Sequence, residues 1–229
     1  MIKIFADGAN KAEILELNKD NRISGFTTNP TLLRKAGISN YKDFALDILS
    51  IIDKPISFEV ISDDLEEMER QAIEISSWGK NVYVKIPITN TKSESTYSII
   101  ESLSNKGIKL NITAITTVKQ VKKILPALET SSGAYISIFA GRIADTGINP
   151  LPIMKQTLKL IKNINVELIW ASPRELYNVV QAEDIGCHII TCTNDILKKL
   201  PLIGKDLTEY SLDTVKMFYN DAKLSGYEL

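Results

Sequence analysis

Residues 81–89 read Asn81-Val82-Tyr83-Val84-Lys85-Ile86-Pro87-Ile88-Thr89, an apolar strand pattern with a lysine near its middle. Alternation puts Val82, Val84 and Ile86 on one face of the strand, and Lys85 on the other face with Tyr83 and Pro87. A buried ammonium group costs several kcal/mol unless it is paired or neutralised. The direction in which this second face looks therefore decides whether Lys85 is a surface residue or part of a site.

The strand that contains Lys85 is one of eight that the sequence predicts. These strands are Ile2–Asp7, Ile23–Asn29, Pro55–Ile61, Val82–Pro87, Lys109–Ile115, Tyr135–Gly141, Val166–Ser172 and Cys187–Thr193. Helical stretches of about 10–16 residues lie between them, and the clearest runs from Asp63 to Trp78. Eight β–α units without a linker rich in Pro, Gly or Ser predict one α/β domain over residues 1–229, folded as a closed (β/α)8 TIM barrel.

Two other architectures share part of this pattern. A doubly wound open sheet usually carries a Gly-rich phosphate loop after its first strand, and the segment Asp7-Gly8-Ala9-Asn10 does not match one. A half-exposed antiparallel sheet would show the same alternation, but it would not alternate with helices. The closed barrel is therefore the preferred interpretation.

One more helix, at about Leu207–Lys223, follows the eighth unit and lies outside the barrel repeat. Its apolar stripe includes Leu212, Val215, Phe218 and Tyr219. We expect this appended C-terminal helix to pack on another surface, for which a neighbouring subunit is a reasonable candidate.

The second strand face carries polar residues that gather toward the end of each strand. In a βα barrel that face points inward, and the carboxyl ends of the strands surround the active site. We expect a common pocket for Asp7, Glu59, Lys85, Asn111, Thr113, Ser137 and Ser172. The alternative is a polar plug whose members satisfy one another and have no further role.

Composition excludes several classes of function. The 229 residues are 44% apolar and 24% charged with a net charge of −1, so nothing attracts nucleic acid or an anionic membrane. The N-terminus MIKIFADGAN does not resemble a signal peptide, and no apolar run is long enough to span a membrane. A single histidine, His188, argues against a His-rich metal centre, and it is interpreted as structural. Cys187 and Cys192 should point to opposite faces of one strand, so we expect reduced thiols and a cytoplasmic location.

A lysine inside such a pocket has a defined chemistry. Its neutral amine attacks a carbonyl group to give an imine, and the protonated imine then acts as an electron sink. That sink permits cleavage or formation of the adjacent carbon–carbon bond, while Asp7 and Glu59 can move the protons. This is aldol chemistry that needs no metal or other cofactor.

Seven segments together resemble the transaldolase family, in particular its small-subunit branch and the related fructose-6-phosphate aldolases. They are FADGAN (5–10), GFTTNPTLL (25–33), SFEV (57–60), VKIP (84–87), NIT (111–113), SIFAGR (137–142) and ASPR (171–174). No one segment is specific, but their order and spacing are, and the likeness extends over nearly the whole chain.

The resemblance implies a role for each matching residue. Lys85 corresponds to the Schiff-base lysine, Asp7 to the catalytic aspartate, and Glu59 to the glutamate that holds a catalytic water. The substrate-binding positions are Thr27, Asn29, Asn111, Thr113, Ser137, Phe139, Arg142, Ser172 and Arg174. Asn29 can also cap a helix that begins at Pro30. The alternative interpretation of Arg142 and Arg174 is that they are ordinary charged surface residues.

The resemblance also implies a reaction and an assembly. Transaldolases pass a dihydroxyacetone unit from a ketose phosphate, such as sedoheptulose 7-phosphate or fructose 6-phosphate, to an aldose phosphate. The aldolase branch usually has Gln and Tyr where this chain has Glu59 and Phe139, so transfer is favoured over release of dihydroxyacetone. The alternatives are fructose-6-phosphate aldolase activity and a non-catalytic sugar-phosphate-binding barrel. Members of the small-subunit branch form rings of subunits, so the resemblance implies a homo-oligomer, either a pentamer or a decamer.

Trp170 is the largest departure from the family pattern, which has a small residue there. Alternation from Ser172 predicts that the indole faces inward, one layer below the pocket. It would then either narrow the pocket or be compensated by smaller residues on facing strands.

Overall fold

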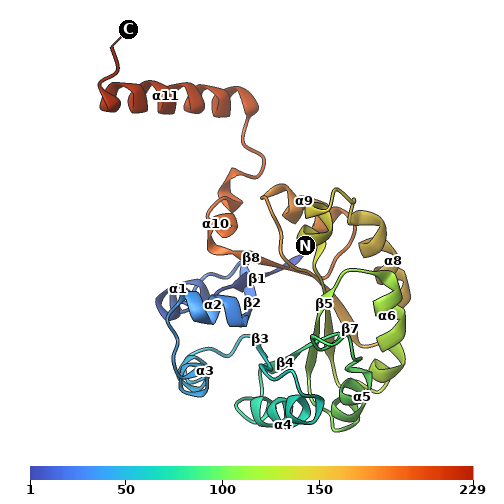
Figure 1. The fold of residues 1–229 in the computed structure, drawn as a ribbon. Coiled ribbons are helices and arrows are strands. Elements are labelled where there is room, and N and C mark those ends of the chain that lie inside the picture. Colours follow the sequence, from blue (N-terminus) through green and yellow to red (C-terminus); the bar gives the residue numbers. More distant parts are fainter. Residues whose placement is uncertain (229) are drawn as a thin grey trace. The chain divides into compact units, whose positions relative to one another are not determined.

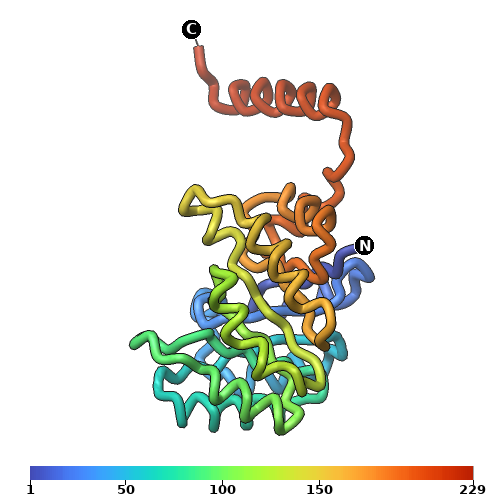
Figure 2. The backbone as a smooth tube through the Cα atoms, turned by 90° about the vertical axis from the view of Figure 1, so that its right-hand side faces the viewer, coloured from blue at the N-terminus to red at the C-terminus, as the bar shows by residue number. Residues whose placement is uncertain are grey.

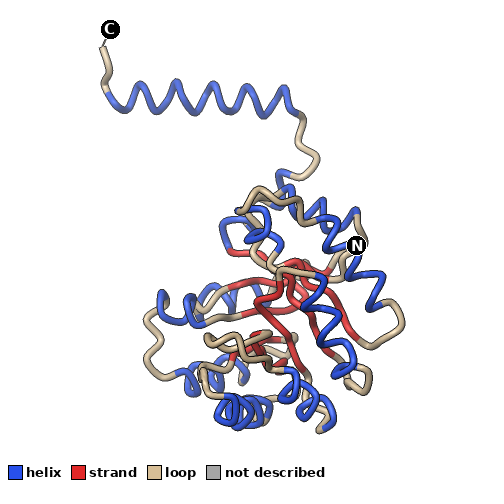
Figure 3. Tube along the Cα trace, turned by 45° about the vertical axis from the view of Figure 1, so that its right-hand side comes forward, coloured by secondary structure: helices blue, strands red, loops and turns tan. Residues whose placement is uncertain are grey.

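Eight parallel strands close into a barrel in the order in which they occur along the chain, with β8 pairing to β1. This arrangement comes from a computed structural model that describes residues 1–228. Within residues 1–197 the strands form the centre and the helices surround them (Figures 1 and 3). The predicted (β/α)8 barrel with an additional C-terminal helix is therefore confirmed.

The barrel strands are short, and each is followed by at least one helix. The strands are β1 (Lys3–Asp7), β2 (Ile23–Thr27), β3 (Ile56–Glu59), β4 (Val82–Pro87), β5 (Leu110–Ile115), β6 (Ala134–Ile138), β7 (Val166–Trp170) and β8 (Ile189–Thr193). The helices that follow them are α1 (Lys11–Asn18), α2 (Pro30–Lys35), α3 (Tyr41–Leu49), α4 (Leu65–Ser76), α5 (Tyr97–Asn105), α6 (Val118–Ile124), η1 (Leu125–Leu128), α7 (Ala140–Asp145), α8 (Leu151–Ile161), α9 (Tyr177–Asp184) and α10 (Asn194–Leu197).

Strands β2, β3, β6 and β7 end two or three residues earlier than the alternation predicts, whereas β1, β4, β5 and β8 end where it predicts. β2 ends at Thr27 because Asn29 already caps α2, and β6 ends at Ile138 because α7 begins at Ala140. At the carboxyl ends the backbone leaves the ladder and turns into loops and helices. This divergence opens the mouth of the barrel.

The predicted helix from Asp63 to Trp78 is also shorter than expected. α4 runs from Leu65 to Ser76, and Asp64 caps it, since its side chain accepts a hydrogen bond from the backbone of Glu67. Its apolar residues Met68, Ala72 and Ile75 lie on one side of the helix and are buried against the barrel.

An aromatic cluster fills the barrel interior. Phe5 on β1 meets Tyr135 on β6 edge to face, with ring centroids 5.8 Å apart, although the two strands are not neighbours in the sheet. Tyr135 also stacks on Tyr83 of β4 at 4.0 Å. Gly25 leaves room for Phe5, because a Cβ atom there would lie 2.6 Å from the phenyl ring. The interior is therefore a packed core that supports the pocket above it.

The chain divides into two compact units, Met1–Leu197 and Lys198–Leu229. The second unit contains η2 (Leu200–Leu202) and α11 (Leu207–Ser225), which forms one uninterrupted helix (Figure 2). Asp206 caps its start, and Gly226 ends it in the left-handed conformation with φ 63°. None of the residues of α11 is buried.

Cys187 and Cys192 are buried thiols rather than a disulfide. Among the helices of residues 1–228, none combines the length and the apolar character that crossing a lipid bilayer requires.

Candidate active site

A cavity of about 400 Å³ lies at the carboxyl ends of the strands. All the predicted site residues except Asn111 line it. They are Asp7, Thr27, Asn29, Glu59, Lys85, Thr113, Ser137, Phe139, Arg142, Ser172 and Arg174. The tertiary structure therefore brings together side chains from seven strands and the segments that follow them.

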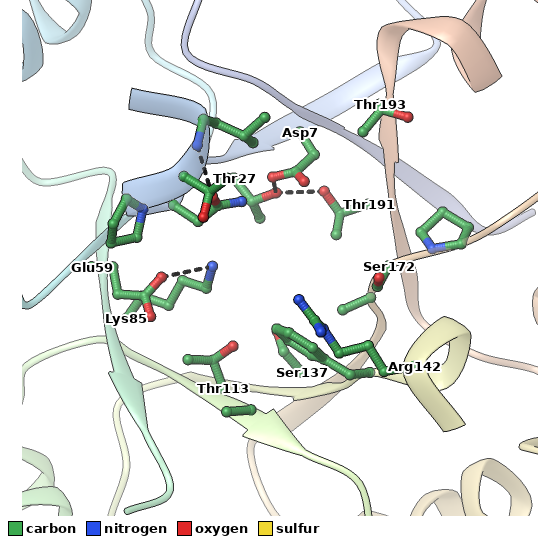
Figure 4. A pocket seen from close by; sticks show the side chains of 18 of the residues that line it. Asp7, Thr27, Glu59, Lys85, Thr113, Ser137, Arg142, Ser172, Thr191 and Thr193 are labelled. Atoms are coloured by element: carbon green, nitrogen blue, oxygen red, sulfur yellow. Dashed lines mark hydrogen bonds and ion pairs between the residues drawn. The ribbon is translucent and has the colours of Figure 1, made fainter. Parts of the chain in front are cut away.

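The side chain of Lys85 points into this cavity, so the strand face that carries it looks into the barrel and not toward solvent (Figure 4). The residue is only 6% exposed. Its Nζ lies 3.1 Å from Oε2 of Glu59 and donates a hydrogen bond to the carbonyl oxygen of Thr28 at 3.0 Å. The strand register explains the pairing, since Glu59 on β3 is the Cα partner of Lys85 on β4. The carboxylate of Glu59 and the carbonyl group of Thr28 thus offset the cost of burying the ammonium group.

Asp7 ends β1 beside a chain of hydroxyl groups. Thr27 donates to Oδ1 of Asp7 at 2.7 Å, and the hydroxyl of Thr191 lies 2.5 Å from that of Thr27. Since Thr27 gives its only hydroxyl proton to Asp7, Thr191 is the donor in the second bond. Burial raises the pKa of the Asp7 carboxyl, and neither nearby Lys85 nor the bond from Thr27 reverses that direction. Asp7 is therefore suited to exchange protons within the cavity.

Asn111 belongs to the same strand layer as Lys85 but does not line the cavity. It is fully buried, donates to the hydroxyl of Ser57 at 3.0 Å and accepts from the hydroxyl of Ser137 at 2.7 Å. Asn111 and Ser137, two of the residues expected in the pocket, are therefore hydrogen-bonded within the protein, as expected if they form a polar plug without a further role. Direct contact of Asn111 with a substrate stays a prediction.

Arginine side chains lie on the opposite side of the cavity. Figure 4 shows Arg142 and Ser172 across the cavity from Glu59 and Lys85. Arg142 of α7 lies over the ring of Phe139, 5.9 Å from its centroid. Arg174 forms an ion pair with Asp145, and this pairing holds the pKa of the Asp145 carboxyl below its ordinary value. Two guanidinium groups beside hydroxyl donors form an arrangement that can bind a phosphate.

The prediction that Trp170 faces inward is wrong. Ile169 and Ala171 pack in the interior cluster with Phe5, so the intervening indole points to the outer side of β7, where it is 1% exposed. The alternation fails at Ser172, which has φ 60°. This left-handed residue turns the chain so that Ala171 and Ser172 both line the cavity. Trp170 therefore packs outside the barrel and does not narrow the pocket.

Strand β5 shows the same kind of irregularity. Ala114 has φ 61°, and the pairing of β5 with β6 shifts between Ile112 and Ile115. Such a bulge re-aims side chains at a barrel rim, and Thr113 and Ala114 both line the cavity. The hydroxyl of Thr113 is buried without a protein partner among the described residues, so it can bond to a molecule in the cavity.

Asn29 has the capping role that the sequence predicts. Its side chain accepts a hydrogen bond from the backbone of Leu32 at 2.9 Å, with Pro30 as the first residue of α2. Because Asn29 also lines the cavity, the start of α2 is held at the rim. His188 is placed at the other end of β8, where its Nδ1 accepts from the backbone of Leu168, as expected of a structural residue.

Sequence reasoning missed several residues of the site. Thr191 and Thr193 line the cavity from β8, and the alternation Ile189, Thr191, Thr193 was a usable signal for them. Gly141 belongs to the SIFAGR segment, but the sequence alone does not predict why a glycine is needed there. A Cβ atom on Gly141 would lie 1.6 Å from the carbonyl oxygen of Ser172, so only glycine lets α7 approach the segment after β7.

Comparison with known proteins agrees with this geometry. Residues 4–228 match the Transaldolase/Fructose-6-phosphate aldolase family. A relative named "Probable transaldolase" from Thermoanaerobacter sp. (strain X514) is 37% identical, and the alignment covers 97% of this chain and 99% of the relative. "Probable transaldolase 2" of Listeria monocytogenes serovar 1/2a is 34% identical over 93% of this chain and 95% of its own.

A solved structure shares the fold at much lower sequence identity. N-acetylneuraminate lyase from Mycoplasma synoviae superimposes with a TM-score of 0.56 at 11% identity, covering 96% of this chain and 80% of the lyase. This likeness concerns the barrel fold alone. The family match over nearly the whole chain carries the assignment, and this chain belongs to the transaldolase/fructose-6-phosphate aldolase family.

Proposed function

We propose that the protein is a transaldolase that transfers a dihydroxyacetone unit between sugar phosphates through a Schiff base on Lys85. The observation that carries this proposal is the position of Lys85, buried in the cavity with its Nζ 3.1 Å from Glu59. Family membership supports an enzyme of the transaldolase or aldolase type.

The reaction would begin when the neutral amine of Lys85 attacks the ketose carbonyl and water leaves. The protonated imine then accepts the electron pair of the bond between its α and β carbon atoms, C3–C4 of the ketose, while the C4 hydroxyl group loses its proton and an aldose phosphate departs. The enzyme-bound enamine then attacks the aldehyde of a second aldose phosphate, and hydrolysis releases the new ketose. The donors are sedoheptulose 7-phosphate or fructose 6-phosphate, and the acceptors are erythrose 4-phosphate or glyceraldehyde 3-phosphate.

The proton transfers are assigned to the two carboxylates. Asp7 takes the proton from the hydroxyl group on the carbon atom that departs with the aldose. It is suited to this role because it lies at the cavity and burial raises the pKa of its carboxyl group. Glu59 holds the water that is released when the imine forms and activates it when the imine is hydrolysed, since its carboxylate adjoins Lys85. Thr27 orients Asp7 through its hydrogen bond. The hydroxyl of Thr113, which has no protein partner among residues 1–228, is available to the same water.

The substrate phosphate is assigned to the opposite side of the cavity. Arg142, Arg174 and Ser172 are assigned as its donors, with the guanidinium groups providing most of the attraction. Ser137 is assigned to the same side, where it would donate to the phosphate after its hydroxyl turns away from Asn111. Phe139 lines the cavity beside Arg142. Asn29 and Asn111 are assigned to the hydroxyl groups of the bound sugar.

A borohydride trapping experiment tests the proposal. Incubation with fructose 6-phosphate and borohydride should reduce the imine, attach the reduced dihydroxyacetone unit to Lys85 and inactivate the protein. Peptide mass mapping then locates the adduct. Lys85→Met should abolish it, whereas Lys54→Met is a matched control, because Lys54 is also a lysine that donates to backbone carbonyl groups, those of Asn18 and Asp20.

The outcomes separate the alternatives. An adduct on another lysine, or no adduct, would contradict the mechanism, and ligand binding without turnover would indicate a sugar-phosphate-binding barrel. Accumulation of free dihydroxyacetone from fructose 6-phosphate, without transfer to an added aldose phosphate, would identify a fructose-6-phosphate aldolase instead.

We also propose that residues 1–229 function as one domain with α11 appended, and that the protein is a homo-oligomer. The support is the exposed apolar side of α11, including Leu212, Val215, Phe218 and Tyr219. A cytoplasmic location stays a prediction based on the reduced thiols.

A further inference from the structure

Tyr41 is the first residue of α3 and lies outside the cavity, yet its hydroxyl group is bonded to the backbone of Glu59 twice. The hydroxyl accepts a hydrogen bond from the N–H of Glu59 at 2.8 Å and donates one to the C=O of the same residue at 3.0 Å. One oxygen atom thus satisfies both main-chain groups of the residue whose carboxylate adjoins Lys85.

The strand geometry explains why these two groups need a partner. Main-chain groups of successive residues in a strand point to opposite neighbouring strands, so every second residue points to the same one. On β3, Ser57 accepts from the N–H of Thr28 on the β2 side, whereas Val60 donates to Lys85 on the β4 side. The N–H and C=O of Glu59 therefore point toward β2, which has already ended at Thr27. Tyr41 takes the place of the missing strand at this open seam.

The tyrosine ring is itself held from two sides. It meets Trp78 at 5.6 Å and Phe58 at 6.1 Å, both edge to face, and Trp78 meets Phe58 at 5.9 Å. Phe58 precedes Glu59 on β3 and is fully buried. The ring is thus packed against the same strand that its hydroxyl group holds, so the hydroxyl has little freedom to move away from Glu59.

We propose that Tyr41 is a positioning residue for Glu59, which fixes the end of β3 so that the carboxylate stays beside Lys85. This proposal rests on the proposed function, because Glu59 must act in proton transfer for its position to matter. Tyr41 does not line the cavity, so its effect reaches the reaction only through Glu59. Within the seam, the hydroxyl can serve as donor and acceptor because burial raises the pKa of Tyr41 and keeps the phenol protonated.

Tyr41→Phe removes the hydroxyl group and keeps the ring packing. A displacement of a catalytic group by about 1 Å can cost about 100-fold in rate, so kcat for transfer should fall about 10- to 100-fold. The donor KM and the final yield of the trapped adduct on Lys85 should remain close to those of the wild type. Tyr97→Phe is the matched control, because the Tyr97 hydroxyl also has one protein partner, the carboxylate of Glu101 on the outer helix α5.

A double-mutant cycle separates positioning from a general loss of structure. If Tyr41 acts through Glu59, adding Tyr41→Phe to Glu59→Gln should lower kcat by less than about 2-fold, because residues in one network are not additive. A second full 10- to 100-fold loss would show that Tyr41 acts independently of Glu59 and would overturn the proposal. A wild-type kcat in folded Tyr41→Phe would overturn it as well.

Amide hydrogen exchange tests the contact without any assay of activity. In Tyr41→Phe the N–H of Glu59 should exchange at least about 10-fold faster, while that of Val60, bonded to Lys85 at 3.1 Å, should keep its protection. An unchanged rate at Glu59 would contradict the seam contact. A missing Lys85 adduct in the wild type would instead contradict the proposed function, and the exchange result would still decide whether Tyr41 holds β3.

Discussion

The ammonium nitrogen of Lys85 lies 3.1 Å from Oε2 of Glu59, and both side chains line the same cavity. The two residues are direct Cα partners on β4 and β3, so the pairing follows from the strand register. The exposed fractions of the two side chains are 7% and 16%, so water screens the pair only weakly. This relationship makes Glu59 the first residue to test after Lys85.

Glu59→Gln should lower kcat for transfer about 10²- to 10⁴-fold, the usual contribution of a general acid–base group, with a much smaller effect on donor binding. The amide keeps the shape of the side chain but cannot carry a proton between water and imine. Steady-state kinetics with a saturating acceptor would measure this. Glu167→Gln is the control, because Glu167 also pairs with a lysine, Lys3, at 2.8 Å but does not line the cavity. Unchanged turnover in Glu59→Gln would assign Glu59 to a purely structural polar layer.

Asp7→Asn should stabilise the protein at neutral pH while it reduces activity. Burial raises the pKa of Asp7 above its ordinary value of 3.8, so the folded state binds the proton more tightly than the unfolded state. The stability that this protonation contributes is present below the unfolded value and is lost as pH rises through the folded value. The advantage of Asp7→Asn should therefore be small near pH 4 and grow toward pH 8.

Urea unfolding of wild type and Asp7→Asn at several pH values would measure that difference. Asp20→Asn offers a control of opposite sign, because hydrogen bonds from Arg22 lower the pKa of Asp20. Removing the Asp20 carboxylate should destabilise the protein at neutral pH rather than stabilise it. A difference between Asp7→Asn and wild type that shrinks as pH rises would contradict the assigned direction.

Arg174→Ala should raise KM for phosphorylated donors about 10- to 100-fold, the equivalent of a charge-assisted hydrogen bond of about 1.5–3 kcal/mol. Free dihydroxyacetone and other unphosphorylated substrates should be affected little, since they present no dianion. Arg70→Ala controls for loss of an arginine, because Arg70 pairs with Glu67 and Glu74 on α4 instead. Equal losses for both classes of donor would argue against a phosphate site at Arg174.

Substitution at position 170 should change the stability of the protein, whereas substitution at position 171 should change its range of acceptors. Trp170→Phe should lower the free energy of unfolding by about 1–2 kcal/mol through lost packing and leave the acceptor range unchanged. The loss is limited because the buried Nε1 of Trp170 has no protein partner among the described residues, and phenylalanine removes that unpaired group. Ala171→Val should instead restrict acceptors, because Ala171 lines the cavity. Acceptor profiles and thermal unfolding of the two variants would check this, and an altered profile in Trp170→Phe alone would contradict it.

The apolar side of α11 should support assembly. Val215 and Phe218 are 60% and 64% exposed, and neither has a buried position in the single chain. Val215→Glu with Phe218→Glu should lower the molar mass measured by light scattering toward that of one chain. Lys216→Glu, which adds a negative charge next to Val215 on the same helix, controls for charge alone. A wild-type protein that is monomeric at micromolar concentration would contradict the assembly.

Short segments of the sequence predict most of the strands and helices of the barrel. Period-two alternation in strands such as Val82–Pro87 and apolar stripes such as Met68, Ala72 and Ile75 identify the eight units, because each depends only on residues close together in the chain. The same alternation identifies Lys85 as a member of the polar face. Local signals at Asn29 and Pro30 also predict the start of α2.

Only the tertiary structure decides where that alternation is interrupted and which side chains meet. The left-handed residues Ala114 and Ser172 interrupt the alternation at the ends of β5 and β7. Because Ser172 breaks it, Trp170 lies outside the barrel although alternation counted back from Ser172 places it inside. No local pattern reports that Tyr41, 18 positions before Glu59, bonds to its backbone. Positive φ at a non-glycine residue and contacts across an open seam persist because the surrounding packing enforces them. A period read along one segment carries no information about that packing.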